Sequence, residues 1–165
     1  MKKKAMWTVG ALFALTMTIL VAAWLRLTSR IVIDEDPSPR LIAQEALLTY
    51  FSLLHDGNYS EAVALFSGSY GLLRDWNPGI DPNDYAALFE NGCTINGLMC
   101  LQVLNVIHEE QISPEEFKFT VEFMNEDGSL FVSGPETTPQ SQFIFTVLKD
   151  EDGKFLVQDS PVYTP

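Results

Sequence analysis

The sequence predicts an α+β fold: one membrane-spanning helix, then a domain with helices in its first half and antiparallel strands in its second. Three patterns support this prediction. Apolar residues recur with a period near 3.6 from about residue 40 to residue 92, they alternate with a period of two in the last third, and an uncharged stretch lies near the start. With 165 residues, 47% of them hydrophobic, the chain can form one domain with a buried core.

The uncharged stretch, residues 5–25, follows a basic start at residues 1–4 and predicts a transmembrane signal-anchor. As a helix it is about 31 Å long, close to the roughly 30 Å hydrocarbon core of a bilayer. Trp7 and Trp24 lie near its ends, where indole rings are favoured. Three lysines before it and two arginines after it favour a cytoplasmic N-terminus and an extracytoplasmic domain. The alternative is a signal peptide cleaved near Ala23, which would give a secreted protein.

The charge of the chain is strongly asymmetric. After position 30 there are five basic and 22 acidic residues, a net charge of −17. Such a domain is repelled by nucleic-acid phosphates and by anionic lipid headgroups. We therefore expect contact with the membrane only through residues 5–25, and no nucleic-acid binding.

Cys93 and Cys100 are the only cysteines in the sequence, and outside the cytoplasm we expect them to form a structural disulfide. The Asn-Gly pair at 96–97 predicts a two-residue hairpin that would place the cysteines opposite each other on neighbouring strands. Buried thiols and a metal or redox role are the alternatives. The spacing is not that of a redox CxxC motif, and a zinc site would need two more ligands, for which only His55 and His108 exist among histidines. We expect no metal and no cofactor.

Residues 26–39 predict a linker, and Ser38-Pro39 predicts the start of the first helix, which should end at Gly57. A second helix is expected after Ser60, and a third after Asp81-Pro82 that Gly92 closes. The expected apolar stripe of the first helix consists of Ile42, Ala46, Leu47, Tyr50, Phe51 and Leu54.

Strands are expected at residues 100–111, 116–124, 142–149 and 154–160, with Asp-Gly turns at 127–128 and 152–153. Parity places one set of apolar side chains on the inward face of the sheet. This set consists of Phe117, Phe119, Val121, Phe123, Phe143, Phe145, Val147, Phe155 and Val157.

The order of these elements resembles the NTF2-like (cone-shaped, cystatin-like) superfamily over about residues 40–163. The opening "ALLTYFSLLHDGNYSEAVALF" is similar to the superfamily's long helix, turn and short helix, and "FIFTVLKDEDGKFLVQDSPVY" is similar to its last hairpin. The resemblance implies about three helices packed on a curved antiparallel sheet that can enclose a pocket. Members include isomerases, dehydratases, cyclases, ligand carriers and interaction domains, so the resemblance does not choose a function.

The inward positions contain no carboxylate, which makes a poor general acid–base site. We therefore expect a membrane-anchored, non-enzymatic binding or interaction domain of the cell envelope. An open cone would hold an apolar small molecule or lipid, whereas a filled one would leave the surface to bind an envelope protein partner. The candidate pocket residues are Phe117, Phe119, Val121, Phe123, Phe143, Phe145 and Asn105. The sequence leaves the oligomeric state open, a homodimer included.

The alternative hypothesis is an isomerase or hydrolase of the same superfamily. His108 would act as general base, with Tyr50 or Tyr85 as a helper from the helices. An inward His108 beside a carboxylate or tyrosine and an open cavity would favour this enzyme, and a solvent-facing His108 would argue against it. His55 is expected only to stabilise the end of the first helix.

Overall fold

The computed structural model describes residues 37–164. The predicted signal-anchor at 5–25 and most of the predicted linker lie outside the described residues. Across residues 37–164, no helix combines the length and the apolar character needed to cross a bilayer.

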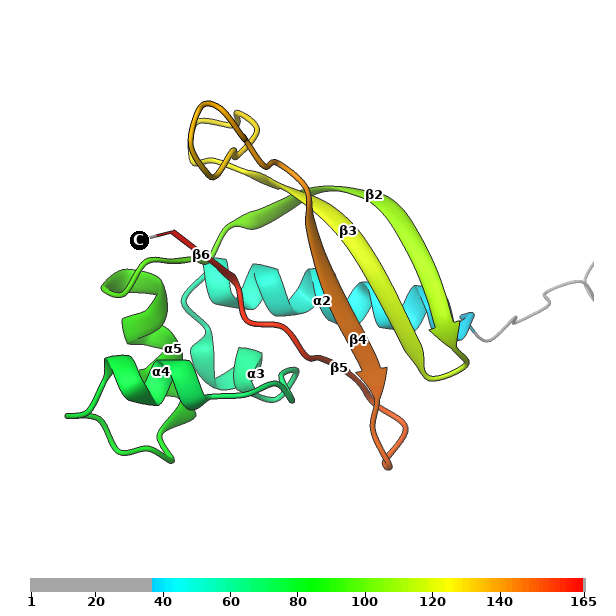
Figure 1. Ribbon diagram of the computed structural model, residues 1–165. Helices are drawn as coiled ribbons and strands as arrows, with labels where there is room; N and C mark the ends of the chain where they lie inside the picture. Colours follow the sequence, from blue (N-terminus) through cyan, green and yellow to red (C-terminus); the bar gives the residue numbers. More distant parts are fainter. Residues whose placement is uncertain (1–36, 165) are drawn as a thin grey trace, which may run out of the picture. The chain divides into compact units, whose positions relative to one another are not determined.

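Figure 1 shows an α+β arrangement in which a curved antiparallel sheet wraps around one long helix. The four-stranded sheet has the order β2 (Gln102–Ser113), β3 (Glu116–Met124), β4 (Phe143–Lys149) and β5 (Phe155–Val157). A separate two-stranded sheet pairs β1 (Leu98–Met99) with β6 (Val162–Tyr163). The predicted α+β class and the curved sheet are confirmed.

The long helix is α2 (Pro39–His55), and its ends are those expected from the sequence. The Ser38 hydroxyl accepts a hydrogen bond from the Leu41 amide at 3.4 Å, and Pro39 occupies the first turn. Beyond His55, Gly57 adopts a φ of +75°, a conformation that a glycine reaches without steric cost. The local signals at both ends of this helix therefore agree with its tertiary setting.

Three short helices follow: α3 (Tyr59–Val63), α4 (Gly71–Trp76) and α5 (Tyr85–Thr94). Helix α4 was not predicted, because six residues are too few to show a helical period. Helix α5 was predicted to end at Gly92, but it continues to Thr94. A Cβ atom at Gly92 would lie 2.8 Å from a methyl carbon of Leu98 and 2.9 Å from one of Leu73, so this glycine serves close packing and not helix termination.

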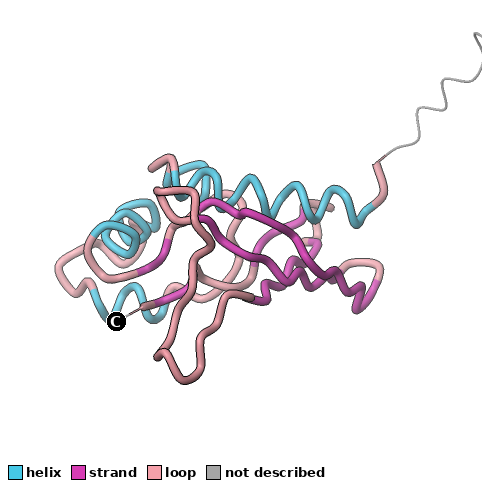
Figure 2. Tube along the Cα trace, turned by 90° about the horizontal axis from the view of Figure 1, so that it is seen from above, coloured by secondary structure: helices cyan, strands magenta, loops and turns pink. Residues whose placement is uncertain are grey.

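The core forms where α2 packs against the inward face of the sheet, an arrangement visible in Figure 2. All nine apolar residues predicted to face inward are buried, none more than 7% exposed. Phe51 of α2 contacts the sheet through edge-to-face ring pairs with Phe123 and Phe145, at centroid distances of 4.9 and 4.7 Å. The strand parity predicted from the sequence is therefore confirmed.

The predicted stripe of α2 is partly wrong. Ala43 is fully buried, whereas Ile42 is 40% exposed and Ala46 is only half-buried. Helical periodicity is compatible with either Ile42 or Ala43 as the first buried residue of α2. The position of the sheet over the helix decides that it is Ala43.

The predicted hairpin at 96–97 is also wrong. Gly97 has the positive φ expected of a turn, +81°, but Cys93 lies in the last turn of α5 and not on a strand. The strand that follows the turn pairs with the chain's last strand, with Leu98 opposite Tyr163 and Met99 opposite Val162. Long-range pairing therefore replaces the local hairpin.

The packing of the inward face predicts a large loss of stability for Phe119→Ala, since this ring is 0% exposed. We expect the free energy of unfolding to fall by about 3–5 kcal/mol. The control is Ile144→Thr on β4, where the side chain is 64% exposed and β-branching is kept, and it should change stability by about 0.5 kcal/mol or less. Denaturant unfolding followed by near-ultraviolet circular dichroism measures both, and equal effects would contradict the described core.

Candidate functional site

The candidate pocket phenylalanines fill the inside of the sheet with their own rings. Phe123 lies 5.8 Å from both Phe143 and Phe145, and Phe117 lies 6.3 Å from Phe119, between ring centroids. Of three surface hollows of about 310 to 400 Å³ in residues 37–164, two are lined by no member of the inward set and one is lined by Phe155. The phenylalanines form a packed core in this structure.

Asn105 and His108 lie on β2, away from that core. Asn105 is exposed and donates a hydrogen bond from its side-chain nitrogen to Glu122 Oε2 at 3.0 Å. His108 is exposed and pairs across the sheet with Thr120. Within residues 37–164, no hydrogen bond joins the His108 ring to a carboxylate or a tyrosine. The structure therefore separates both residues from the candidate pocket.

The two helper tyrosines lie in an aromatic cluster formed by the helices. Tyr50 is fully buried and stacks on Phe66 at 5.8 Å, and Phe66 in turn contacts Tyr70 at 5.1 Å. Tyr70 stacks on Tyr85 at 4.2 Å. The Arg74 guanidinium lies over the Tyr85 ring at 5.6 Å and donates to the Tyr85 hydroxyl at 3.4 Å. The structure brings Tyr50 and Tyr85 into one cluster and does not bring His108 to it.

The hydroxyls of Tyr50 and Tyr70 are buried and make no hydrogen bond to the described protein groups. Burial raises the pKa of Tyr50 well above its usual value, and the neighbouring Tyr70 and Asp159 add to this. Burial is also the main reason why the pKa of Tyr70 is raised to about 12; Tyr85 raises it further and Arg74 lowers it. Both phenols stay protonated near neutral pH, so they are hydrogen-bond donors and not bases.

The disulfide between Cys93 and Cys100 is present, with the two Cα atoms 5.5 Å apart. It joins the last turn of α5 to the segment between β1 and β2. His55 lies beside it, with Nδ1 3.3 Å from the Cys100 carbonyl oxygen. This contact links the end of α2 to the disulfide loop, and the stabilisation of the helix end by His55 stays a prediction. His55 and the two cysteines line a surface hollow of about 310 Å³, and Tyr59 and Glu126 line it as well.

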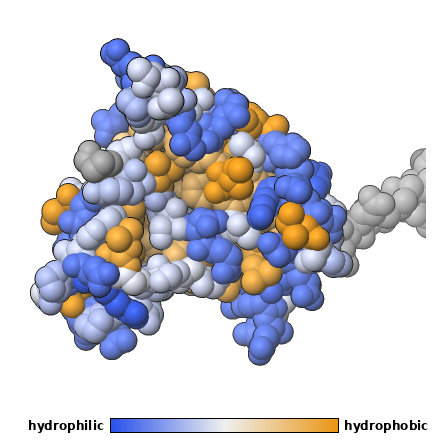
Figure 3. Space-filling view, in the orientation of Figure 1, coloured by the Kyte–Doolittle hydropathy of each residue, from blue (hydrophilic) through white to orange (hydrophobic). Residues whose placement is uncertain are grey.

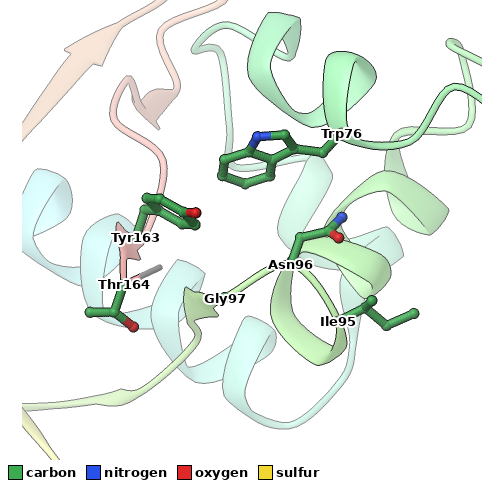
Figure 4. Close-up of a pocket in the computed structure, with 6 residues that line it drawn as sticks. All are labelled: Trp76, Ile95, Asn96, Gly97, Tyr163 and Thr164. Carbon is green, nitrogen blue, oxygen red and sulfur yellow. The ribbon is translucent and has the colours of Figure 1, made fainter.

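A second hollow, of about 400 Å³, lies at the end of α4 and has an uncharged lining (Figure 4). The rings of Trp76 and Tyr163 form one wall, with centroids 4.8 Å apart. Asn96 is held in place because its side-chain nitrogen donates to Asn77 Oδ1 at 2.9 Å. Sequence reasoning missed this hollow, because Trp76 and Tyr163 are 87 positions apart and no local pattern connects them.

Neither the hollows nor the core contain an evident metal centre. Within the described residues, no group of three or more histidine, cysteine or acidic side chains could hold a metal ion. Comparisons with protein-family models, with curated proteins and with solved structures found no match for this chain. Function must therefore be argued from the geometry of this molecule.

The disulfide predicts a measurable contribution to stability. Replacing both cysteines, Cys93→Ala with Cys100→Ala, should lower the free energy of unfolding by about 2.5 kcal/mol. Without the bridge the unfolded chain regains the conformational entropy that the closed loop removes, which stabilises the unfolded state. Denaturant unfolding with and without reducing agent measures the effect: the parent chain should respond to the reductant and the variant should not. A parent chain that is indifferent to reductant would contradict this prediction.

The raised tyrosine pKa values predict a loss of stability at alkaline pH. The part of the folding stability that depends on a protonated Tyr70 is fully present below pH 10, where the phenol is protonated in both the folded and the unfolded states. It is lost as the pH rises from 10 to about 12, because only the unfolded chain ionises there. Tyr70→Phe should make the unfolding free energy less sensitive to pH in that window, as followed by circular dichroism. An unchanged pH profile would contradict the burial of this hydroxyl.

Proposed function

We propose that residues 40–163 form a non-enzymatic interaction domain of the NTF2-like type, which residues 5–25 anchor on the outside of a cell membrane. The observation that carries this proposal is the packed core. Phe117, Phe119, Val121 and Phe123 are each at most 1% exposed, which leaves the outer surface for recognition. A filled cone suits a domain that presents its surface to a protein partner.

The disulfide supports the extracytoplasmic location. Bridges of this kind form and persist in oxidising compartments and are rare in the cytosol. The domain is strongly acidic, so anionic lipid headgroups repel its surface and it would not bind the membrane directly. Attachment through residues 5–25 would then hold the domain at the membrane.

The position of His108 gives less support to the enzyme alternative. An exposed ring on β2, opposite Thr120, is not surrounded by the water-excluding walls in which general bases operate. The buried, protonated tyrosines in the helical half do not lie beside it. The carrier alternative requires an opening among rings that lie about 5 to 6 Å apart.

The experiment is native mass spectrometry of the full chain, extracted from membranes of the source organism in a mild detergent without reducing agent. We expect a stoichiometric complex with another protein and no bound small molecule. His108→Ala should leave the complex unchanged. A small molecule that is released on denaturation would replace this proposal with a carrier, and a bare chain over a range of detergents would argue against a stable partner.

A further inference from the structure

The strand β2 contains three irregularities, and each one exposes an aliphatic side chain. Register shifts against β3 occur between Val103 and Asn105, between Val106 and His108, and between Gln111 and Ser113. The unpaired residues at these bulges are Leu104, Ile107 and Ile112, which are 38%, 42% and 45% exposed. We call these three residues the bulge patch.

The curvature of the sheet explains the bulges but not their side chains. A β-bulge bends and twists its strand through the extra backbone residue, whatever side chain that residue carries. The leucine and two isoleucines at the three positions leave part of their apolar surface in water. Figure 3 shows hydrophobic groups separated by hydrophilic ones on one face of the molecule.

The bulge patch lies on the free edge of the described sheet. At the opposite edge, Val157 of β5 is covered because it accepts a hydrogen bond from the Ser67 amide at 2.9 Å and donates one to the Leu65 carbonyl at 2.8 Å. Among residues 37–164, β2 pairs with β3 alone. Bulges interrupt the regular hydrogen-bonding pattern of an edge strand, so a partner would pack mainly against side chains and not extend the sheet.

Charge selects the kind of partner. The β2–β3 hairpin, residues 102–124, carries five glutamates and one lysine, and one of these glutamates, Glu109, is paired with Arg40 of α2. A second copy of this domain would bring the same acidic surface, and an anionic lipid surface would also be repelled. A protein segment with aliphatic side chains and a net positive charge is complementary to this surface, since its aliphatic groups match the bulge patch and its basic groups match the glutamates.

We propose that the bulge patch binds such a basic, aliphatic segment of another extracytoplasmic protein. This inference rests on the proposed interaction function and names its surface. The apolar contacts would be made to Leu104, Ile107 and Ile112, and the basic groups would lie against glutamates of the hairpin, such as Glu110.

The test is photo-crosslinking in cells of the source organism that produce the full chain. Ile107→p-benzoylphenylalanine and Ile112→p-benzoylphenylalanine place the crosslinker in the patch. The matched control is Leu72→p-benzoylphenylalanine on α4, where the natural leucine is 51% exposed and lines none of the three hollows. An intact Cys93–Cys100 disulfide, seen by mass spectrometry, shows that each variant has folded.

We expect both patch positions to crosslink to the same protein, through a peptide of net positive charge, and the control to give no such product. Adding Ile107→Asp should lower the yield from position 112 by at least about tenfold, as for a central contact residue. Adding Leu72→Asp should not lower it.

Crosslinks to a second copy, to lipid or to an acidic segment, or no crosslinks from the patch, would overturn the proposal. If the control position captures a partner and the patch does not, the interaction function survives and only its surface is wrong. If no position crosslinks and native mass spectrometry shows a bare chain, the proposed function fails as well.

Discussion

The packing of α2 into the curved sheet is the constraint on which the rest of this structure depends. Phe51 contacts Phe123 and Phe145 edge to face, and the neighbouring inward side chains close around this contact. Because these rings occupy the inside of the sheet, they favour recognition at the outer surface over a ligand in the interior. The choice between a carrier and an interaction domain therefore depends on how phenylalanine side chains fill space.

The same packing shapes the surface. A sheet that wraps around a helix must bend, and β2 bends at three bulges where Leu104, Ile107 and Ile112 have no partner on β3. Arg40 of α2 forms an ion pair with Glu109 of β2, which also ties this strand to the helix. Core packing thus accounts for the bends of this edge strand, but not for the aliphatic side chains at its bulges. The proposed docking surface combines these bends with side chains that the curvature alone does not require.

The helical half is held together by different interactions. The disulfide and the His55 contact join the ends of α2 and α5 to the start of β2. Asn77 connects three segments, because its oxygen accepts from Asn91 and Asn96 and its nitrogen donates to the Leu73 carbonyl at 2.7 Å. These satisfied polar contacts add to the apolar packing of Leu73 and Leu98 against α5 and orient the segments relative to one another.

The sequence by itself determined the α+β class, the start and end of α2 and the inward residues of β3 to β5, since each depends on short-range periodicity or on a few neighbouring residues. The cysteine pairing was predicted because the sequence has only two cysteines, although the local hairpin expected to join them does not form. Only the tertiary structure decided that Leu98 pairs with Tyr163, that α5 runs past Gly92, and that His108 is exposed. Each bulge shifts the alternation of β2 by one residue, so parity could not place His108 or Asn105. These features arise from contacts between segments far apart in the chain, which local patterns do not record.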